Sequence, residues 1–367
     1  MIEIKHLNKN DLLDFIKSEE FSTLNFIPIS KNRAISHCEN PRLNQNDVLL
    51  FLAYEDKNLV GYLGALPDQI FINDSFQKCT WLSCLWIDPQ QRGKKIAQKL
   101  LDSCFQVWEN RILVTEFTDS AKYLYDKSGI FNSLSEKRGV RLYFRSDLEK
   151  LLPPKKEFFN KIKPLLKVSD NFFNLFIDFK NSFVRNKLNS TLKIVRVSEI
   201  DDELIDFIKS KQEKQLFKRG KEELNWILKF PWIVSSPQTS ESKKYHFSSV
   251  DKSFEFIALK LYNKTNELRA FVMFSKRNQS LKLPYCYFEN ENLPDIMDVI
   301  NYYIQELKVS TFTCFNYEIA IFLNENKTKA FHKKEIKRNY IISKVFGETV
   351  LEQKFEIQDG DADACFT

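Results

Sequence analysis

The stretch Leu85-Trp86-Ile87-Asp88-Pro89-Gln90-Gln91-Arg92-Gly93-Lys94-Lys95-Ile96-Ala97 decides the fold of this chain. An apolar run ends at Pro89, a short basic turn that contains Gly93 follows, and a helical run from Gln98 to Trp108 starts directly after the turn. The free backbone N–H groups at the start of a helix, together with the helix dipole, favour a bound phosphate or pyrophosphate. The stretch therefore predicts a strand, a phosphate-binding turn and a helix, and with them a phosphate-bearing cofactor.

A second motif follows the next strand-like run, residues 111–117. It reads Thr118-Asp119-Ser120-Ala121-Lys122-Tyr123-Leu124-Tyr125-Asp126-Lys127-Ser128-Gly129-Ile130. Together with Arg92-Gly93-Lys94-Lys95-Ile96-Ala97, it resembles the two motifs of the GNAT superfamily of N-acyltransferases, which are Arg/Gln-x-x-Gly-x-Gly/Ala and Asn-x-x-Ala-x-x-Leu-Tyr-x-Lys-x-Gly-Phe. Because both motifs occur in the right order and spacing, the resemblance is specific.

The chain departs from the family pattern at three positions. Lys95 stands in place of the middle Gly, Thr118 in place of Asn, and Ile130 in place of Phe. A backbone amide donates a hydrogen bond whatever its side chain is, so Lys95 is expected to keep the phosphate site provided that its backbone is helical.

The resemblance implies a site for acetyl-CoA or another short acyl-CoA as the co-substrate. The residues that would bind it lie on the strand before the turn, in the turn and on the second motif: Leu85, Trp86, Ile87, Arg92, Gly93, Lys94, Lys95, Ile96, Ala97, Thr118, Ala121 and Lys127. Tyr125 would be the acid that protonates the CoA thiolate. Glu116 is a candidate for the base that deprotonates the incoming amine, because it lies near the end of a strand next to the cleft. Asp88, His37, Glu39 and an ordered water remain as alternatives.

The composition indicates an ordinary globular protein of 367 residues, long enough for two domains. The net charge of +6 is small and the basic residues form no uninterrupted block, so binding to nucleic acid is not expected. The chain starts directly with a strand-like run, and no apolar run reaches the roughly 18 residues of a membrane-spanning helix. These features predict no membrane association and a cytoplasmic protein.

Cys and His residues form no metal-binding pattern. The seven Cys lack a C-x-x-C pair and a His at metal spacing, so reduced thiols and no metal site are expected. Cys84 has no basic activator in the sequence, which favours core packing over a nucleophile. The four His belong to no paired motif and are interpreted as structural or surface residues: His6, His37, His246 and His332.

The opening of the chain is repeated in its second half. Asp14-Phe15-Ile16-Lys17-Ser18 and Asp206-Phe207-Ile208-Lys209-Ser210 each follow a short strand-like run, and the order of elements after them is the same. A tandem of two related domains is the economical interpretation. We predict an α/β (α+β) fold of two tandem GNAT-like domains, each with a mixed, mostly antiparallel sheet flanked by helices. The predicted parts are a catalytic domain at 1–147 with a polar loop near 30–46, a helical connector at 148–190, a degenerate domain at 191–347 and a C-terminal tail at 348–367. The acidic end of this tail, residues 358–367, is expected to be exposed.

The second half lacks the phosphate-binding turn. Its corresponding segment is Glu289-Asn290-Glu291-Asn292-Leu293-Pro294, which is acidic and contains neither Gly nor Arg. If Ala320 and Leu323 are aligned with Ala121 and Leu124, then Asn324 takes the place of Tyr125. The second domain is therefore expected to shape the acceptor pocket or to stabilise the first domain.

The resemblance implies an acyl-CoA-dependent N-acyltransferase that works by direct attack in a ternary complex. The tandem layout resembles bacterial nucleotide-sugar N-acyltransferases, which predicts a nucleotide-linked amino sugar as acceptor, specifically a dTDP-3-amino-3,6-dideoxyhexose of surface polysaccharide (lipopolysaccharide) biosynthesis. An aminoacyl, peptide or small-amine acceptor is the alternative among enzymes, and a non-catalytic acyl-CoA-binding scaffold is the alternative outside them. A monomer and a homodimer both remain open.

Overall fold

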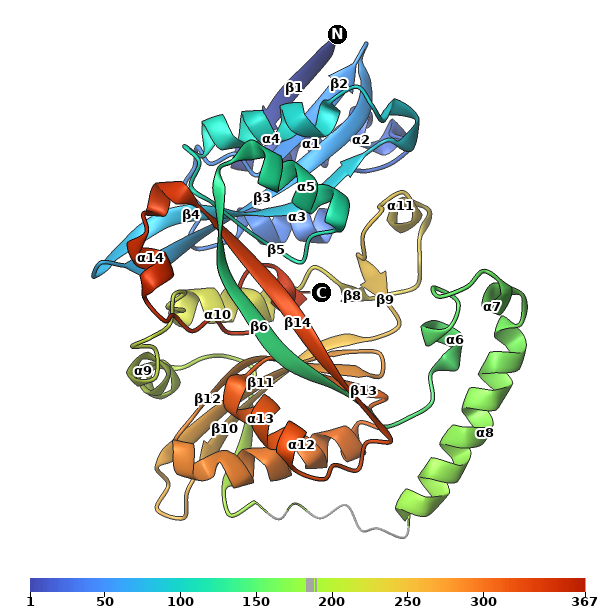
Figure 1. Cartoon of the computed structure of the whole chain (residues 1–367), viewed down its shortest axis with the longest axis vertical. Helices are drawn as coiled ribbons and strands as arrows, with labels where there is room; N and C mark the ends of the chain where they lie inside the picture. Colours follow the sequence, from blue (N-terminus) through green and yellow to red (C-terminus); the bar gives the residue numbers. More distant parts are fainter. Residues whose placement is uncertain (183–187, 189, 367) are drawn as a thin grey trace. The chain divides into compact units, whose positions relative to one another are not determined.

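The computed structural model of the chain describes residues 1–182, 188 and 190–366 and divides into two compact units (Figure 1). Unit 1 consists of Met1–Lys137, Val197–Phe254 and Lys337–Thr367, and unit 2 of Arg138–Arg196 and Glu255–Ile336. The predicted domain limits at residues 147 and 191 stay predictions, and residues 183–187 and 189 of the predicted connector lie outside the described residues. None of the helices in the described ranges is both long and apolar enough to span a membrane.

Unit 1 contains a sheet with the strand order β1-β2-β3-β4-β5-β14. All neighbouring strands are antiparallel except β4 and β5, which are parallel. This confirms the predicted mixed, mostly antiparallel sheet. The bounds are β1 Ile2–Leu7, β2 Leu50–Glu55, β3 Asn58–Ile72, β4 Ser75–Ile87, β5 Ile112–Thr115 and β14 His332–Ser343.

Two apolar cores cover the two faces of this sheet, as the side chains of β2 show. Leu50 and Leu52 pack with residues of α1, α2 and α3, whereas Phe51 and Ala53 pack with residues of α4 and α5. This alternation is the period of two expected for a strand buried on both faces. The helices are α1 Lys9–Phe15, α2 Glu19–Thr23, α3 Lys31–Cys38, α4 Ile96–Val107 and α5 Asp119–Ser128.

Helix α3 lies in the stretch 30–46, where the prediction of a polar loop is wrong. The Ser30 side chain caps α3 by accepting a hydrogen bond from the backbone N–H of Arg33 at 3.3 Å. The buried face of α3 carries Arg33 and His37 beside Ala34 and Cys38. Ser36 is buried as well, so three of the five buried residues of α3 are polar and the helix shows no apolar stripe in the sequence.

The middle and the end of the chain add further elements to unit 1. These elements are short helices and two-residue strands, and they include the repeated segment Asp206 to Ser210, which forms part of α9. The bounds are α9 Asp202–Ser210, α10 Lys221–Lys229, β8 Val234–Ser235, α11 Ser240–Lys243, β9 Val250–Asp251, η3 Lys344–Phe346, α14 Thr349–Glu352 and η4 Ala364–Phe366.

Unit 2 contains a second sheet segment with the strand order β6-β13-β12-β11-β10-β7. Its β12, η2, α12, β13 and α13 repeat the order of β4, η1 (Pro89–Gln91), α4, β5 and α5, and β12 and β13 are again parallel. The bounds are β6 Phe131–Tyr143, α6 Leu148–Leu151, α7 Phe158–Lys161, α8 Lys163–Ser182, β7 Lys193–Val197, β10 Phe254–Tyr262, β11 Leu268–Arg277, β12 Ser280–Phe288, η2 Asn290–Asn292, α12 Leu293–Glu306, β13 Thr311–Cys314 and α13 Tyr317–Glu325.

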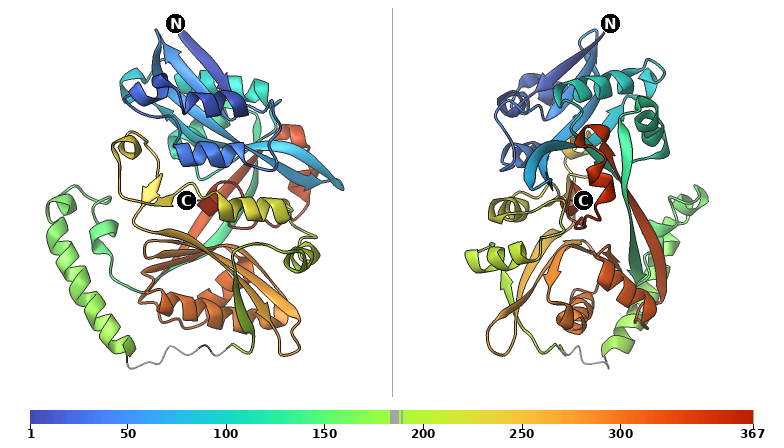
Figure 2. Two further views of the ribbon diagram at one scale, coloured as in Figure 1. Left: turned by 180° about the vertical axis from the view of Figure 1, so that it is seen from behind. Right: turned by 60° about the vertical axis from the view of Figure 1, so that its left-hand side comes forward.

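The last strands of the two sequence halves exchange partners. Strand β6 ends the first half, yet it pairs with β13 of unit 2 through Val140 and Leu142. Strand β14 ends the second half, yet it pairs with β5 of unit 1 through Tyr340 and Ile342. The two strands are neighbours in the sheet and run side by side in both views of Figure 2. Each half of the sequence therefore supplies the strand that follows the parallel pair of the other half.

Candidate active site

Strand β4 separates from β5 midway along its length. The parallel pairing consists of Thr80 with Ile112 and Trp81 with Leu113, and it does not continue to Ile87, where β4 ends. Within this free part Cys84 has a left-handed backbone with a φ of 55°, and the register with β3 shifts at the same place. A strained residue at a bulge redirects the strand and leaves backbone N–H and C=O groups unpaired. Beyond Trp81 the side of β4 that faces away from β3 therefore has no strand partner among the described residues, and its backbone groups are available to a ligand.

The bulge is closely packed against β3. A Cβ atom at Gly64 would lie 2.9 Å from the Ser83 carbonyl oxygen, so only glycine fits this position without a shift. Beyond the bulge the side chains of β4 divide between the two cores. Leu85 and Ile87 pack toward α4 and α5, whereas Cys84 and Trp86 pack toward α1, α2 and α3. We call the first the cofactor face and the second the acceptor face of β4.

The predicted phosphate-binding turn connects β4 with α4. Asp88 caps η1 by accepting a hydrogen bond from the backbone N–H of Gln90 at 2.9 Å. Gly93 has a φ of 87° and Lys95 a φ of 60°, and α4 begins at Ile96. The prediction for Lys95 required a helical backbone, and the left-handed backbone does not meet this condition. A left-handed backbone is favourable for glycine, which the family pattern has at this position.

The start of α4 is open to a ligand. No side chain within the described residues caps the helix at Lys95, so its first-turn N–H groups, those of Ile96 and Ala97 included, are free of an internal cap. Arg92, Gly93, Lys94 and Lys95 are all exposed around this helix end. Lys94 Nζ lies 2.6 Å from Glu55 Oε2, an exposed contact that a phosphate group can replace.

Replacing Lys95 by glycine is expected to raise the free energy of unfolding by about 0.5–1 kcal/mol. The change removes the cost of about 1–2 kcal/mol that a left-handed residue with a Cβ atom carries, and part of this gain is lost to the greater freedom of unfolded glycine. Urea denaturation measures the difference. Lys99→Gly, on the same helix but inside it, is the matched control and is expected to destabilise by about 1 kcal/mol. A loss of stability in Lys95→Gly would contradict the left-handed backbone.

The second motif forms α5 as predicted. Thr118 caps the helix by accepting a hydrogen bond from the N–H of Ala121 at 3.3 Å, so it performs the capping for which asparagine is equally suited. Ala121 and Tyr125 lie on the buried face of α5, one turn apart, in the core that α4 also contributes to. Lys127 is exposed in the last turn of α5, where its charge complements the helix dipole.

Tyr125 is the buried aromatic residue of α5. Its ring makes edge contacts with Phe117 at 5.8 Å and Phe131 at 5.6 Å between ring centroids. Burial raises the pKa of its hydroxyl above the usual value, and the Cys104 thiol on α4 adds to the rise. The hydroxyl therefore stays protonated at neutral pH and lies on the cofactor face of β4.

Glu116 follows β5 in a left-handed conformation, with a φ of 51°. Its Oε1 lies 2.6 Å from Nη2 of the buried Arg338 on β14. This ion pair ties the carboxylate to β14, while the Glu116 side chain stays 44% exposed. Its assignment as the base stays a prediction. Of the other candidate bases, His37 is fully buried, and Glu39 is exposed where α3 ends.

A buried arginine of α3 links the bulge of β4 to the rest of unit 1. The Arg33 guanidinium stacks on the Trp232 ring at 3.9 Å and reaches four further side chains: it donates to His37 Nε2 at 3.4 Å, to Tyr245 Oη at 3.3 Å, and to Cys84 Sγ and Ser83 Oγ. Burial raises the pKa of the Cys84 thiol more than Arg33 lowers it. Cys84 therefore remains a thiol that positions the bulge. Sequence reasoning missed Arg33 because α3 reads as a loop.

The end of the chain is buried, so the prediction of an exposed tail is wrong. Cys365 and Phe366 are fully buried, and the Phe366 ring stacks on Trp232 at 4.5 Å. The alternating aspartates of the tail meet buried arginines: Asp359 contacts Arg338, Asp361 lies 3.0 Å from Arg219, and Asp363 lies 3.8 Å from Arg33. Asp363 also accepts a hydrogen bond from Ser83 at the bulge, at 2.7 Å. The alternation of aspartates is the sequence signal that could have predicted this packing.

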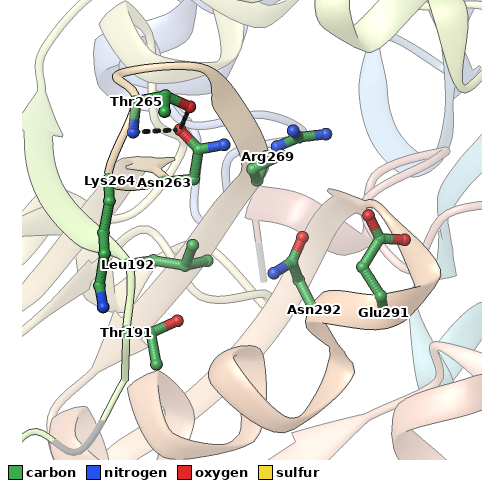
Figure 3. Close-up of a pocket in the computed structure, with 8 residues that line it drawn as sticks. All are labelled: Thr191, Leu192, Asn263, Lys264, Thr265, Arg269, Glu291 and Asn292. Atoms are coloured by element: carbon green, nitrogen blue, oxygen red, sulfur yellow. Dashed lines mark hydrogen bonds between the residues drawn. The ribbon is translucent and has the colours of Figure 1, made fainter.

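Unit 2 has an acidic counterpart of the phosphate-binding turn. Asp295, in the first turn of α12, accepts hydrogen bonds from the N–H of Thr191 at 2.7 Å and from Ser190 Oγ at 3.0 Å. A carboxylate of the protein thus occupies the helix end that would hold a phosphate. Beside it lies an open pocket of about 380 Å³ (Figure 3), lined by Thr191, Leu192, Asn263, Lys264, Thr265, Arg269, Glu291 and Asn292.

The comparisons with known proteins agree with this geometry. Residues 12–130 match the model of the acetyltransferase (GNAT) family. A solved structure from Enterococcus faecalis V583, described as a probable N-acyltransferase, is similar over 96% of this chain and 75% of its own, with a TM-score of 0.55 and 11% identity. N-myristoyltransferase of Saccharomyces cerevisiae, solved with bound myristoyl-CoA, is similar over 93% of this chain and 82% of its own, with a TM-score of 0.51 and 12% identity. No curated protein matches.

The two solved structures share the fold, and the family match covers β2 to α5, the elements that carry both sequence motifs. Residues 12–130, which carry both sequence motifs, are thus similar to the acetyltransferase (GNAT) family, and the fold of the whole chain is similar to that of the two solved acyltransferase structures.

Proposed function

We propose that unit 1 binds an acyl-CoA between β4 and β5 and transfers its acyl group to a primary amine. The observation that carries the proposal is the separation of β4 from β5 at the Cys84 bulge, directly before an uncapped helix start. The unpaired backbone at Leu85 and Ile87 would hold the pantetheine arm and polarise the acyl carbonyl. The first-turn N–H groups of α4 and the Arg92 side chain would hold the pyrophosphate.

The reaction needs no covalent enzyme intermediate. The amine nitrogen attacks the thioester carbon, the C–S bond breaks, and Tyr125 protonates the departing thiolate. Cys84 is a thiol held by Arg33 and Tyr245, which does not favour attack by its sulfur. Acetyl or a short acyl group is the proposed donor group, and a nucleotide-linked amino sugar remains the predicted acceptor.

Replacing Arg92 by glutamate is expected to weaken acetyl-CoA binding by about 10–100-fold. A charge-assisted hydrogen bond contributes about 1.5–3 kcal/mol, and the new carboxylate adds repulsion of the pyrophosphate. Isothermal titration calorimetry with acetyl-CoA measures the effect. Arg111→Glu is the charge-matched control, because Arg111 lies at the start of β5, away from the turn in sequence, and contacts only the exposed Glu109 among the ion pairs found.

The same titration with dTDP and UDP added tests the acceptor. Binding of a nucleotide beside acetyl-CoA would support a nucleotide-linked amino sugar, whereas acetyl-CoA binding without nucleotide binding would move the weight to small-amine or peptide acceptors. If wild type binds no acetyl-CoA, the site assignment fails.

A further inference from the structure

A group of aromatic side chains surrounds Trp86 on the acceptor face of β4. We call it the aromatic wall, and it consists of Phe26, Tyr62, Trp86, His246 and Phe247. The His246 ring stacks on Trp86 at 4.1 Å with an angle of 14°, and Phe26 lies 4.4 Å from Trp86. Tyr62 stacks on the same indole at 5.6 Å and also contacts Phe247 at 6.5 Å. Trp86 is thus the centre of the wall, and it follows the bulge that presents the strand backbone.

The outer members of the wall reach solvent. His246 is exposed, Phe247 is 38% exposed, and Phe26 and Trp86 are half-buried. These four residues come from three segments that are distant in sequence, the loop after α2, strand β4 and the loop after α11, and all lie in unit 1. A partly exposed aromatic surface beside a reaction centre is suited to a flat or apolar group of the acceptor.

His246 differs from the other ionisable groups near the bulge because its ring nitrogens have no hydrogen-bond or ion-pair partner within residues 1–182, 188 and 190–366. Asp363 accepts from Ser83 at 2.7 Å, Glu116 pairs with Arg338 at 2.6 Å, and His37 is buried against Arg33. Among these groups, His246 alone combines an exposed side chain with a ring stacked on Trp86, the β4 residue that follows the bulge.

We propose that His246 is the general base of the acyl transfer and that the aromatic wall binds the acceptor, a primary amine on a flat, hydrophobic carrier. This inference rests on the proposed acyl transfer at the same site, and for the acceptor it favours the small-amine alternative over a nucleotide-linked amino sugar. The ammonium form of the acceptor gives one proton to the His246 imidazole, which passes it to solvent. The free amine then attacks the thioester carbon, and its second proton is lost as the adduct collapses to the amide. The thiolate receives one proton through Tyr125, so the products are amide, CoA and one released proton.

The charges around His246 fit this role. Asp88, at the end of β4, faces it and attracts an incoming ammonium, and on its own loop Lys244 is directed to the Ser22 carbonyl at 3.2 Å. On the α2–α3 side Lys31 pairs with Glu241 at 2.8 Å. Burial lowers the pKa of His246 more than Asp88 raises it, so the imidazole is neutral and able to accept a proton at neutral pH.

The test is acetyl-CoA turnover with 2-phenylethylamine as the amine probe, followed by release of the CoA thiol. The expected result for His246→Gln is a kcat lowered by about 100-fold or more, an unchanged KM for acetyl-CoA, and loss of the fall in kcat/KM that wild type shows at acidic pH, where the lowered pKa of His246 places its protonation. His6→Gln is the matched control: His6 is also exposed and contacts Ser103 Oγ at 2.6 Å on α4, and its variant is expected to keep the wild-type rate and pH profile. Trp86→Leu is expected to raise the KM for 2-phenylethylamine about 10-fold. Its KM for acetyl-CoA is expected to stay unchanged, because Trp86 packs on the face opposite to Leu85 and Ile87 and not, as the sequence had predicted, with the cofactor-binding residues.

The outcomes separate the two proposals. If wild type binds no acetyl-CoA, the proposed function fails. If wild type binds acetyl-CoA but ethanolamine is acylated as efficiently as 2-phenylethylamine, or neither amine is acylated, the assignment of the wall to a flat, hydrophobic amine is overturned. If His246→Gln keeps the rate and the acid limb, His246 is not the base.

Discussion

Replacing Asp68 by asparagine is expected to lower the free energy of unfolding by about 3–5 kcal/mol. Asp68 is almost fully buried and accepts hydrogen bonds from Arg42 at 2.5 Å, from both Nη atoms of Arg219 at 2.8 Å and from Trp81 Nε1 at 2.9 Å. The amide keeps the shape of the side chain but removes the charge that two buried guanidinium groups face. Urea denaturation monitored by tryptophan fluorescence measures the loss.

The stability difference between wild type and Asp68→Asn is expected to depend on pH. Burial raises the pKa of Asp68, but the charges of Arg219 and Arg42 outweigh burial, and together these effects lower the pKa from the ordinary 3.8 to about 2. Because the pKa of Asp68 is lower in the folded than in the unfolded protein, the ionised carboxylate stabilises the fold at pH values above the unfolded-state pKa. This contribution to the free energy of unfolding is lost as the pH falls from about 4 toward 2. The shift is worth roughly 2 kcal/mol, so the gap between wild type and Asp68→Asn should narrow over that interval.

The matched control is Asp126→Asn on α5. Asp126 pairs with Lys122 at 2.5 Å, and both side chains are more than half exposed. An exposed pair of this kind contributes about 0–1 kcal/mol, so the variant should remain close to wild type at every pH. Equal effects in the two variants would mean that Asp68 is not the centre of a buried charge network.

Local sequence patterns predict the turn and the two helices of the candidate cofactor site, because the residues that form each of them are close together in the sequence. The turn from Asp88 to Ala97 and the helix after Thr118 each follow from capping, glycine and apolar spacing within one short stretch. Even the departure at Thr118 has a local explanation, since threonine caps α5 directly. A motif of about a dozen residues is therefore enough to predict where the turn lies and where each helix begins.

The acceptor side was not predictable in this way, because its residues meet only through the fold. Arg33 comes from α3, Tyr245 from the loop after α11 and Asp363 from the tail, and no short pattern joins them. Their polar side chains hide the apolar periodicity that identifies buried elements. The exchange of β6 and β14 is equally remote from local sequence, since antiparallel pairing depends on partners far along the chain.

Tyr125→Phe is expected to lower kcat by about 100-fold or more while acetyl-CoA binding and stability stay unchanged. The phenyl ring keeps the contacts with Phe117 and Phe131, and the hydroxyl has no hydrogen-bond partner within the described residues that its removal would leave unpaired. What is lost is the proton for the CoA thiolate. Because burial raises the pKa of this hydroxyl, wild type should show no fall in rate from its ionisation up to pH 9. Acyl transfer measured by thiol release, together with calorimetry, separates kcat from binding.

The chain offers a control on the same helix. Tyr123 lies two residues before Tyr125 and is 65% exposed, because positions two apart face different sides of a helix. Tyr123→Phe should therefore turn over like wild type. An unchanged rate in Tyr125→Phe would rule out the assigned acid, and the thiolate would then have to take its proton from solvent through the opening between β4 and β5. A loss in both variants would instead indicate that α5 had moved, and the acetyl-CoA affinity would fall with it.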